Sequence, residues 1–104
     1  MRFLSAVILF FSIFCIAKAQ NTYLVPSQYS SIQEAIDSSS NGDTIQIAAG
    51  TYYEYDITVN KQVAIIGADS SSTILVDTTN SDTVRCFYIT VLNVSIGDLT
   101  IKNY

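Results

Sequence analysis

The amino-acid sequence predicts an all-β fold, a parallel β-helix (solenoid) of two to three coils with a short N-terminal capping helix. A unit in which two apolar residues flank one other residue, the period of a strand with one buried face, recurs seven times after residue 43. Strands this short cannot bury that face alone, so successive coils must stack on one another. The units are Ile45-Gln46-Ile47, Ile57-Thr58-Val59, Val63-Ala64-Ile65, Ile74-Leu75-Val76, Phe87-Tyr88-Ile89, Val94-Ser95-Ile96 and Leu99-Thr100-Ile101.

The spacing of these units distinguishes a solenoid from a sandwich of hairpins. A sandwich favours longer strands joined by two-residue Asn-Gly or Asp-Gly turns, whereas the one Asn-Gly pair here stands before the first unit. The intervals between the first residues of these units predict a short coil from Ile45 to Val63 and a longer one from Val63 to Val94. The polar stretch 77–82 is expected to loop out of the longer coil. Sharp turns with positive φ are expected at Gly50, Gly67 and Gly97.

Residues 20–43 are expected to form an N-terminal cap that contains one helix of about two turns. Ser31 and Glu34 fit a capping box, in which the serine accepts from a free backbone N–H and the glutamate reaches back. An apolar stripe follows at helical spacing, and Asn41-Gly42 supplies the stop. The stripe, Ile32, Ala35 and Ile36, predicts a lid on residues 44–104, the β-helix coils.

Residues 1–19 have the features of a secretory signal peptide. Arg2 precedes an apolar run over residues 3–16, and Ala17 and Ala19 are the small residues that a signal peptidase requires. Cleavage is expected between Ala19 and Gln20, which predicts a secreted or extracellular protein. The apolar run is short for a membrane span, so a protein anchored by its uncleaved signal is the lesser alternative.

Charge and cysteine content change when the leader is removed. The whole chain has five basic and nine acidic residues and a net charge of −4, and loss of Arg2 and Lys18 lowers the charge to −6. Nucleic acid is therefore not an expected partner, because phosphate binding needs clustered basic residues. Cys86 is the one cysteine left, so no internal disulfide is expected. We interpret it as a small buried residue within a strand, with an intermolecular disulfide as the alternative.

Five segments follow one another along the chain: Val25-Pro26, residues 29–36, residues 42–47, residues 50–54 and residues 63–67. In this order they resemble the N-terminal cap and first coils of pectin-lyase-like parallel β-helix proteins, and residues 94–103 resemble one further coil. The resemblance covers nearly all of the mature chain and implies a right-handed β-helix, in agreement with the usual hand of parallel crossovers. It implies no single activity, because the same opening occurs in pectinesterase-like enzymes and in generic parallel β-helix repeat proteins.

The residues offer little catalytic chemistry. No histidine is present, which excludes histidine-dependent triads and His-ligated zinc. Polysaccharide-active β-helix enzymes would need Asp, Arg, Lys or Gln side chains stacked on one outer face over successive coils. Glu54 and Asp56 are close in sequence, but Glu54 belongs to a turn that the resemblance shares across activities, and Asp56 precedes a strand. No catalytic residue is assigned.

No metal site or cofactor is expected either, because Asp69, Asp77 and Asp82 lack the spacing of a calcium loop. Asn93-Val94-Ser95 is an N-glycosylation sequon, usable if the source is eukaryotic and Asn93 is exposed. Asn93 could instead sit in a polar turn or an asparagine stack. Six of the seven tyrosines are expected to pack in the fold rather than to bind sugars. The six are Tyr23, Tyr29, Tyr52, Tyr53, Tyr55 and Tyr88.

The sequence stops at Tyr104 within a predicted strand, with no second cap, so we expect an incomplete β-helix. Its open C-terminal edge would favour end-to-end self-association. Two functions fit. The first is a secreted or cell-surface β-helix repeat module without catalytic activity that binds carbohydrate or a surface partner. The second is the N-terminal fragment of a pectinesterase- or pectate-lyase-like enzyme whose catalytic coils would follow Tyr104.

Overall fold

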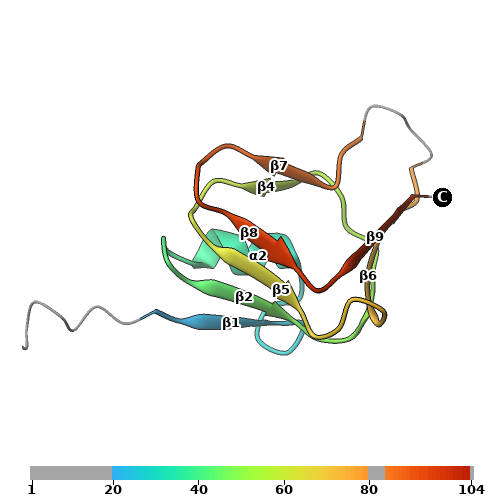
Figure 1. Ribbon diagram of the computed structural model, residues 1–104, viewed down its shortest axis with the longest axis horizontal. Coiled ribbons are helices and arrows are strands. Elements are labelled where there is room, and N and C mark those ends of the chain that lie inside the picture. Colours follow the sequence, from blue (N-terminus) through green and yellow to red (C-terminus); the bar gives the residue numbers. More distant parts are fainter. Residues whose placement is uncertain (1–19, 80–83, 104) are drawn as a thin grey trace, which may run out of the picture.

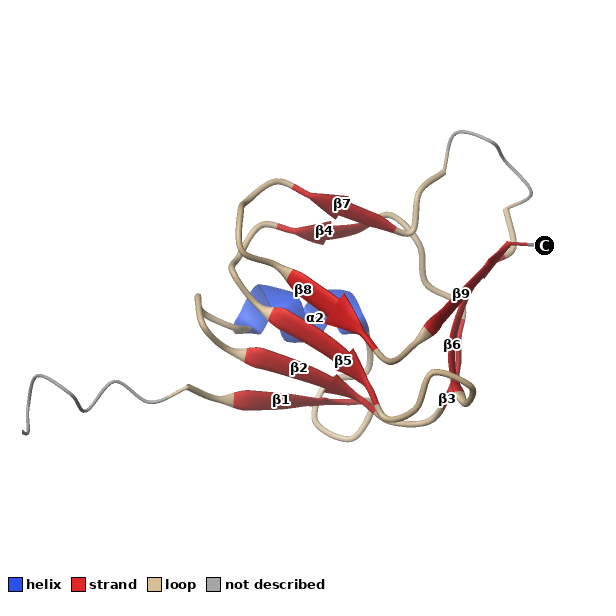
Figure 2. Ribbon diagram, in the orientation of Figure 1, coloured by secondary structure: helices blue, strands red, loops and turns tan. Residues whose placement is uncertain are grey.

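The computed structural model describes residues 20–79 and 84–103, which form a parallel β-solenoid of about three turns (Figure 1). The strands pair in parallel into three sheets, with orders β1-β2-β5-β8, β3-β6-β9 and β4-β7. One short helix, α2 (Ile32–Ser38), lies among the described residues (Figure 2). The predicted fold class is confirmed. The strands are β1 (Thr22–Val25), β2 (Thr44–Ile47), β3 (Gly50–Tyr52), β4 (Ile57–Val59), β5 (Ala64–Gly67), β6 (Thr73–Asp77), β7 (Phe87–Ile89), β8 (Ser95–Gly97) and β9 (Thr100–Asn103).

The register between coils corrects one of the two predicted spacings. Ile45 of β2 pairs with Ile65 of β5, so this coil is longer than the interval from Ile45 to Val63 predicted. Val63 is also buried, but it precedes β5 and is not the partner of Ile45. The second spacing is as predicted, because Ala64 pairs with Ser95, which reproduces the interval from Val63 to Val94. The sequence of an alternating unit does not indicate which of its two apolar residues pairs with the strand of the previous coil.

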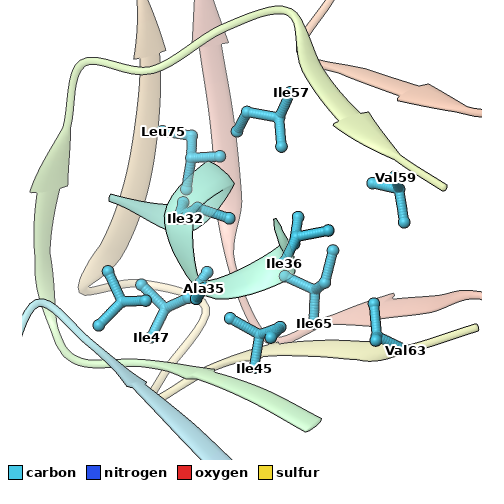
Figure 3. Packing of buried hydrophobic residues seen from close by; sticks show 11 residues of the cluster. Ile32, Ala35, Ile36, Ile45, Ile47, Ile57, Val59, Val63, Ile65 and Leu75 are labelled. Carbon is cyan, nitrogen blue, oxygen red and sulfur yellow. The ribbon is translucent and has the colours of Figure 1, made fainter. Parts of the chain in front are cut away.

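The core lies inside the coils and beneath α2. Figure 3 shows the helix presenting Ile32, Ala35 and Ile36 toward the inward residues of the coils, and all three are buried. In the largest sheet the inward position is held by Tyr23, Ile45, Ile65 and Ile96 in successive strands. The predicted lid is therefore confirmed, with its apolar stripe facing the first coil.

Strand β6 departs from the prediction at one of its two ends. The unit Ile74-Leu75-Val76 predicts that Ile74 and Val76 point inward, but Ile74 is half-buried and Leu75 belongs to the core cluster. Val76 is buried as predicted, although it is not a member of that cluster. The register explains the position of Leu75, because Leu75 pairs with Tyr52, which also packs on the core. Three consecutive apolar residues have no alternation, so the sequence could not decide the buried face.

Two of the three turn glycines do not have the expected conformation. Gly50 has the predicted positive φ, +153°. It is the first residue of strand β3, however, whereas the sequence predicts a turn there. Gly67 and Gly97 do not have positive φ. Gly42 has φ of +94°, and three polar residues, of types that adopt the left-handed region more readily than most side chains do, also have positive φ: Asp56 (φ 52°), Asn93 (φ 61°) and Asp98 (φ 57°).

The N-terminus of α2 is capped by two side chains, and one of them was not predicted. Ser31 Oγ accepts from the Glu34 N–H at 3.1 Å, as expected. Glu34 does not reach back to the serine N–H, and instead accepts from Ser30 Oγ at 2.7 Å. Glu54 lies between β3 and β4. Its carboxylate accepts from the N–H groups of Ile32 (2.9 Å) and Gln33 (3.4 Å). These are free donors at any helix start, so Glu54 takes over part of the capping.

The rest of the helix is fastened to the segment that carries β4. The Gln33 side chain pairs with the backbone of Thr58 like a neighbouring strand, accepting from its N–H at 2.8 Å and donating to its carbonyl at 3.1 Å. Lys61 Nζ donates to the carbonyls of Asp37 and Ser39, both at 2.6 Å, where α2 ends. The helix thus ends before Asn41-Gly42, the predicted stop. Residues 54–61 therefore hold the lid in its first turn and at its end.

The coil at the other end of the solenoid exposes apolar side chains. Ile89, Leu92 and Ile101 are 44%, 80% and 53% exposed. Within the described residues, β7, β8 and β9 each have a strand neighbour on one side. End-to-end association at this face stays a prediction.

Candidate functional site

The two carboxylates that sequence proximity suggested as an acid/base pair have separate roles. Glu54 is engaged by the backbone of α2. Asp56 is exposed, adopts a left-handed backbone conformation, and its Oδ1 lies 3.7 Å from Arg85 Nε. A catalytic pair would need both carboxylates free and facing the same substrate bond. This arrangement does not provide that.

Asp56, Arg85 and Tyr88 instead form a polar and aromatic cluster, which we call the Tyr88 cluster. The Arg85 guanidinium carbon lies 4.1 Å from the centre of the Tyr88 ring, within the range of a cation–π interaction. The side chains of Arg85 and Asp56 are 59% and 53% exposed, and Tyr88 is 46% exposed. The cluster therefore places an aromatic ring, a cation and a carboxylate together on the surface.

The pairing of β4 with β7 brings the cluster together. The Asp56 N–H donates to the Arg85 carbonyl at 2.7 Å, and the Ile57 N–H donates to the Cys86 carbonyl at 2.9 Å. Asp56 thus lies directly before β4, and Arg85 lies two residues before β7 in the adjacent coil; both strands are at the top of Figure 1. Asp56 and Tyr88 stand out in the sequence, whereas Arg85 does not. The register of β4 with β7 aligns Asp56 with Cys86, the residue next to Arg85, so the cluster follows only once this register is known.

The other tyrosines divide between the core and the surface. Tyr23 and Tyr29 pack together on the core with ring centres 5.6 Å apart, and burial raises the pKa of Tyr23. Tyr52 also packs on the core, its hydroxyl donates to the Ala48 carbonyl at 2.7 Å, and its pKa is raised by burial. Tyr53 and Tyr55 are exposed. The predicted packing is therefore observed for Tyr23, Tyr29 and Tyr52.

A second polar site fastens the N-terminal strand. Asp43 is buried, and its carboxylate accepts from the backbone N–H groups of Asn21 (3.0 Å) and Ser40 (2.8 Å). These two hydrogen bonds hold the pKa of Asp43 below its usual value. The two backbone groups that the carboxylate accepts from lie beside β1 and α2, so this is a structural site.

The remaining predicted site residues fall in different places. Asn93 is exposed in the loop before β8, in a left-handed conformation. Gln20 is exposed at the start of the described chain, whereas Ala19 and Asp82 lie outside it. Asp69 and Asp77 accept hydrogen bonds from Ser71 and Thr79 nearby. The described residues contain no group of three or more His, Cys, Asp or Glu side chains arranged to hold a metal.

Cys86 is half-buried, directly before β7 rather than within it, and packs on the core. Burial, with a smaller contribution from the charges of Asp77 and Glu54, raises the pKa of the Cys86 thiol to about 11. The thiolate, which is the reactive form, is therefore scarce at neutral pH.

We expect the Cys86 thiol of the folded protein to react slowly with a thiol reagent at pH 8. Each unit of raised pKa lowers the thiolate fraction about tenfold, so the rate should be on the order of 100-fold below that in denaturant. The measurement is the rate of absorbance change with an aromatic disulfide reagent in buffer and in guanidinium chloride. Equal rates in the two solutions would show that Cys86 is not protected by the fold.

Comparisons with protein-family models, curated proteins and solved structures find no match to this chain. Among the residues that the structure describes, no helix is long and apolar enough to cross a membrane.

Proposed function

We propose that this chain is a secreted or cell-surface β-helix module, related to the pectin-lyase-like superfamily, that binds carbohydrate without catalysing a reaction. The Tyr88 cluster carries the proposal. Its ring offers an apolar face for a sugar, and Arg85 and Asp56 offer hydrogen-bond donors and acceptors for hydroxyl groups. Export rests on the leader sequence in residues 1–19.

The exposure of the Asp56–Arg85 pair supports a binding role over a structural one. Exposed ion pairs contribute about 0–1 kcal/mol to stability, so the fold gains little from keeping this one. Both side chains are more than half exposed and can exchange their mutual contact for contacts with a ligand. Glu54 is already engaged by α2, which leaves the cluster without the second carboxylate that glycoside hydrolysis requires.

The charge of the mature chain favours a neutral ligand. With three basic residues against nine acidic ones, the protein repels a polyanion at low ionic strength. The charge of Arg85 is also offset by Asp56. We therefore propose a neutral polysaccharide rather than pectin. Asn93, which is exposed, is a proposed glycosylation site in a eukaryotic source.

Tyr88→Ala is expected to weaken binding of the secreted protein to a neutral polysaccharide about tenfold, because the apolar ring is lost. The measurement is depletion of the protein from solution by insoluble xylan, cellulose and β-glucan, with soluble pectin as the acidic comparison. Tyr53→Ala removes a ring that is 67% exposed outside the cluster, and serves as the matched control.

Three results of this experiment would contradict the proposal. The first is that the protein binds none of the neutral polysaccharides. The second is an equal loss of binding in Tyr88→Ala and Tyr53→Ala, and the third is stronger binding to pectin than to the neutral polysaccharides. The bound polysaccharides are also assayed for cleavage and pectin for de-esterification. Activity above background would favour the second candidate, a polysaccharide-active enzyme, for which the stacking of Asp56 and Arg85 in adjacent coils is the supporting observation.

A further inference from the structure

We propose that Gln20 is a modification site that becomes pyroglutamate in the mature protein. The inference rests on the export step of the proposed function, because cleavage after Ala19 creates a free α-amino group on Gln20. That nitrogen attacks Cδ of the same residue's side-chain amide. The new N–Cδ bond closes a five-membered lactam, the Cδ–Nε2 bond breaks, and ammonia leaves with a proton from the amine. No oxidant or second substrate is needed.

The structure leaves Gln20 free to react while it fixes the next residue. The Asn21 N–H donates to Asp43 Oδ1 at 3.0 Å, and the Asn21 carbonyl accepts from the Thr44 N–H at 2.9 Å. Gln20 itself is exposed, and its side chain lies over Gly42, where a Cβ would be 3.8 Å from Nε2. Ring closure therefore moves one exposed side chain and leaves the hydrogen bonds of β1 in place.

Cyclisation would protect the strand that begins the largest sheet. Tyr23 and Val25 of β1 pack on the core, and β1 pairs with β2 over four residues. An aminopeptidase that removed Gln20 and Asn21 would delete the hydrogen bonds to Asp43 and Thr44 and start to shorten β1. Because an aminopeptidase acts on a free α-amine, the lactam blocks the first step of this trimming.

Mass spectrometry of the N-terminal peptide of the secreted full-length product tests the inference. The expected peptide begins at Gln20 and is lighter than its unmodified form by one ammonia. A peptide that begins at Gln20 with its amine free would overturn the modification and leave export intact. A peptide that begins at another residue, or a retained leader, would overturn the cleavage on which both proposals depend.

A variant makes the functional consequence measurable. Gln20→Ala places a small residue after the cleavage point and keeps the Asn21 backbone contacts, but it cannot form the lactam. Incubation with a broad-specificity aminopeptidase should shorten this variant and leave the wild-type protein at full length, as read by intact mass. Equal trimming of the two proteins would contradict a protective role for Gln20.

Discussion

Gly67→Ala is expected to lower the free energy of unfolding by about 3 kcal/mol and to loosen the third coil from the second. A Cβ at residue 67 would lie 2.1 Å from the Asp98 carbonyl oxygen and 3.0 Å from Thr73 Cβ. The first of these is a backbone atom, so no rotation of a side chain can relieve the overlap. Urea unfolding followed by circular dichroism measures the loss.

Gly97→Ala is the matched control for this effect. Gly97 pairs with Ile66 in the same sheet, one coil further along, and nothing lies within 4 Å of the position its Cβ would take. Its φ is not positive, so alanine fits, and stability should be unchanged or rise by about 0.4–1 kcal/mol through the unfolded chain. Similar losses in the two variants would mean that close approach to Asp98 is not what requires glycine at residue 67.

Local patterns were sufficient to predict α2 and seven of the nine described strands, although not β1 or β3. Ile32, Ala35 and Ile36 are within one helical turn of each other, so their shared face follows from the period of the helix alone. Ile45 and Ile47 define the inward face of β2 in the same way. Features of this kind depend on a few neighbouring residues, and the sequence displays them directly.

The contacts between coils could not be predicted in this way. The partner of Ile45 is Ile65 and not Val63, and the choice depends on how the turn before β5 is closed. Glu54 caps α2 from a distant part of the sequence, because the coil returns beneath the helix. Neither contact has a signal in the local pattern, since a capping glutamate distant in sequence looks like any other surface acid.

The candidate site was missed for the same reason. Asp56 attracted attention beside Glu54, its neighbour in sequence, whereas its partner in space is Arg85. The loop between β6 and β7 lengthens this coil, so that Ile57 and its partner Phe87 are further apart in sequence than paired residues of β2 and β5. With unequal coils, no single repeat length aligns the outer faces, and a surface cluster becomes visible only when the register is known.

Ile65→Ala is expected to lower the free energy of unfolding by about 2–5 kcal/mol, because it opens a cavity at the centre of the largest sheet. Ile65 is fully buried and lies beside Ile45 in the core (Figure 3). It pairs with Ile96 of the next coil on its other side. Domains of this kind are stable by about 5–15 kcal/mol, so the loss is a large share of the total. Thermal and urea unfolding should both report it.

Ile66→Ala on the same strand is the matched control, because it makes the same change of residue type without opening a closed cavity. Ile66 is half-buried, and the hydrogen bond that it accepts from Gln46 Nε2 involves only its backbone carbonyl. This variant loses the same atoms and the same strand preference but opens no closed cavity, so its loss should be less than half that of Ile65→Ala. If the two losses were equal, Ile65 would not face the interior, and the stacking of Ile45, Ile65 and Ile96 would not be the contact that joins the three coils.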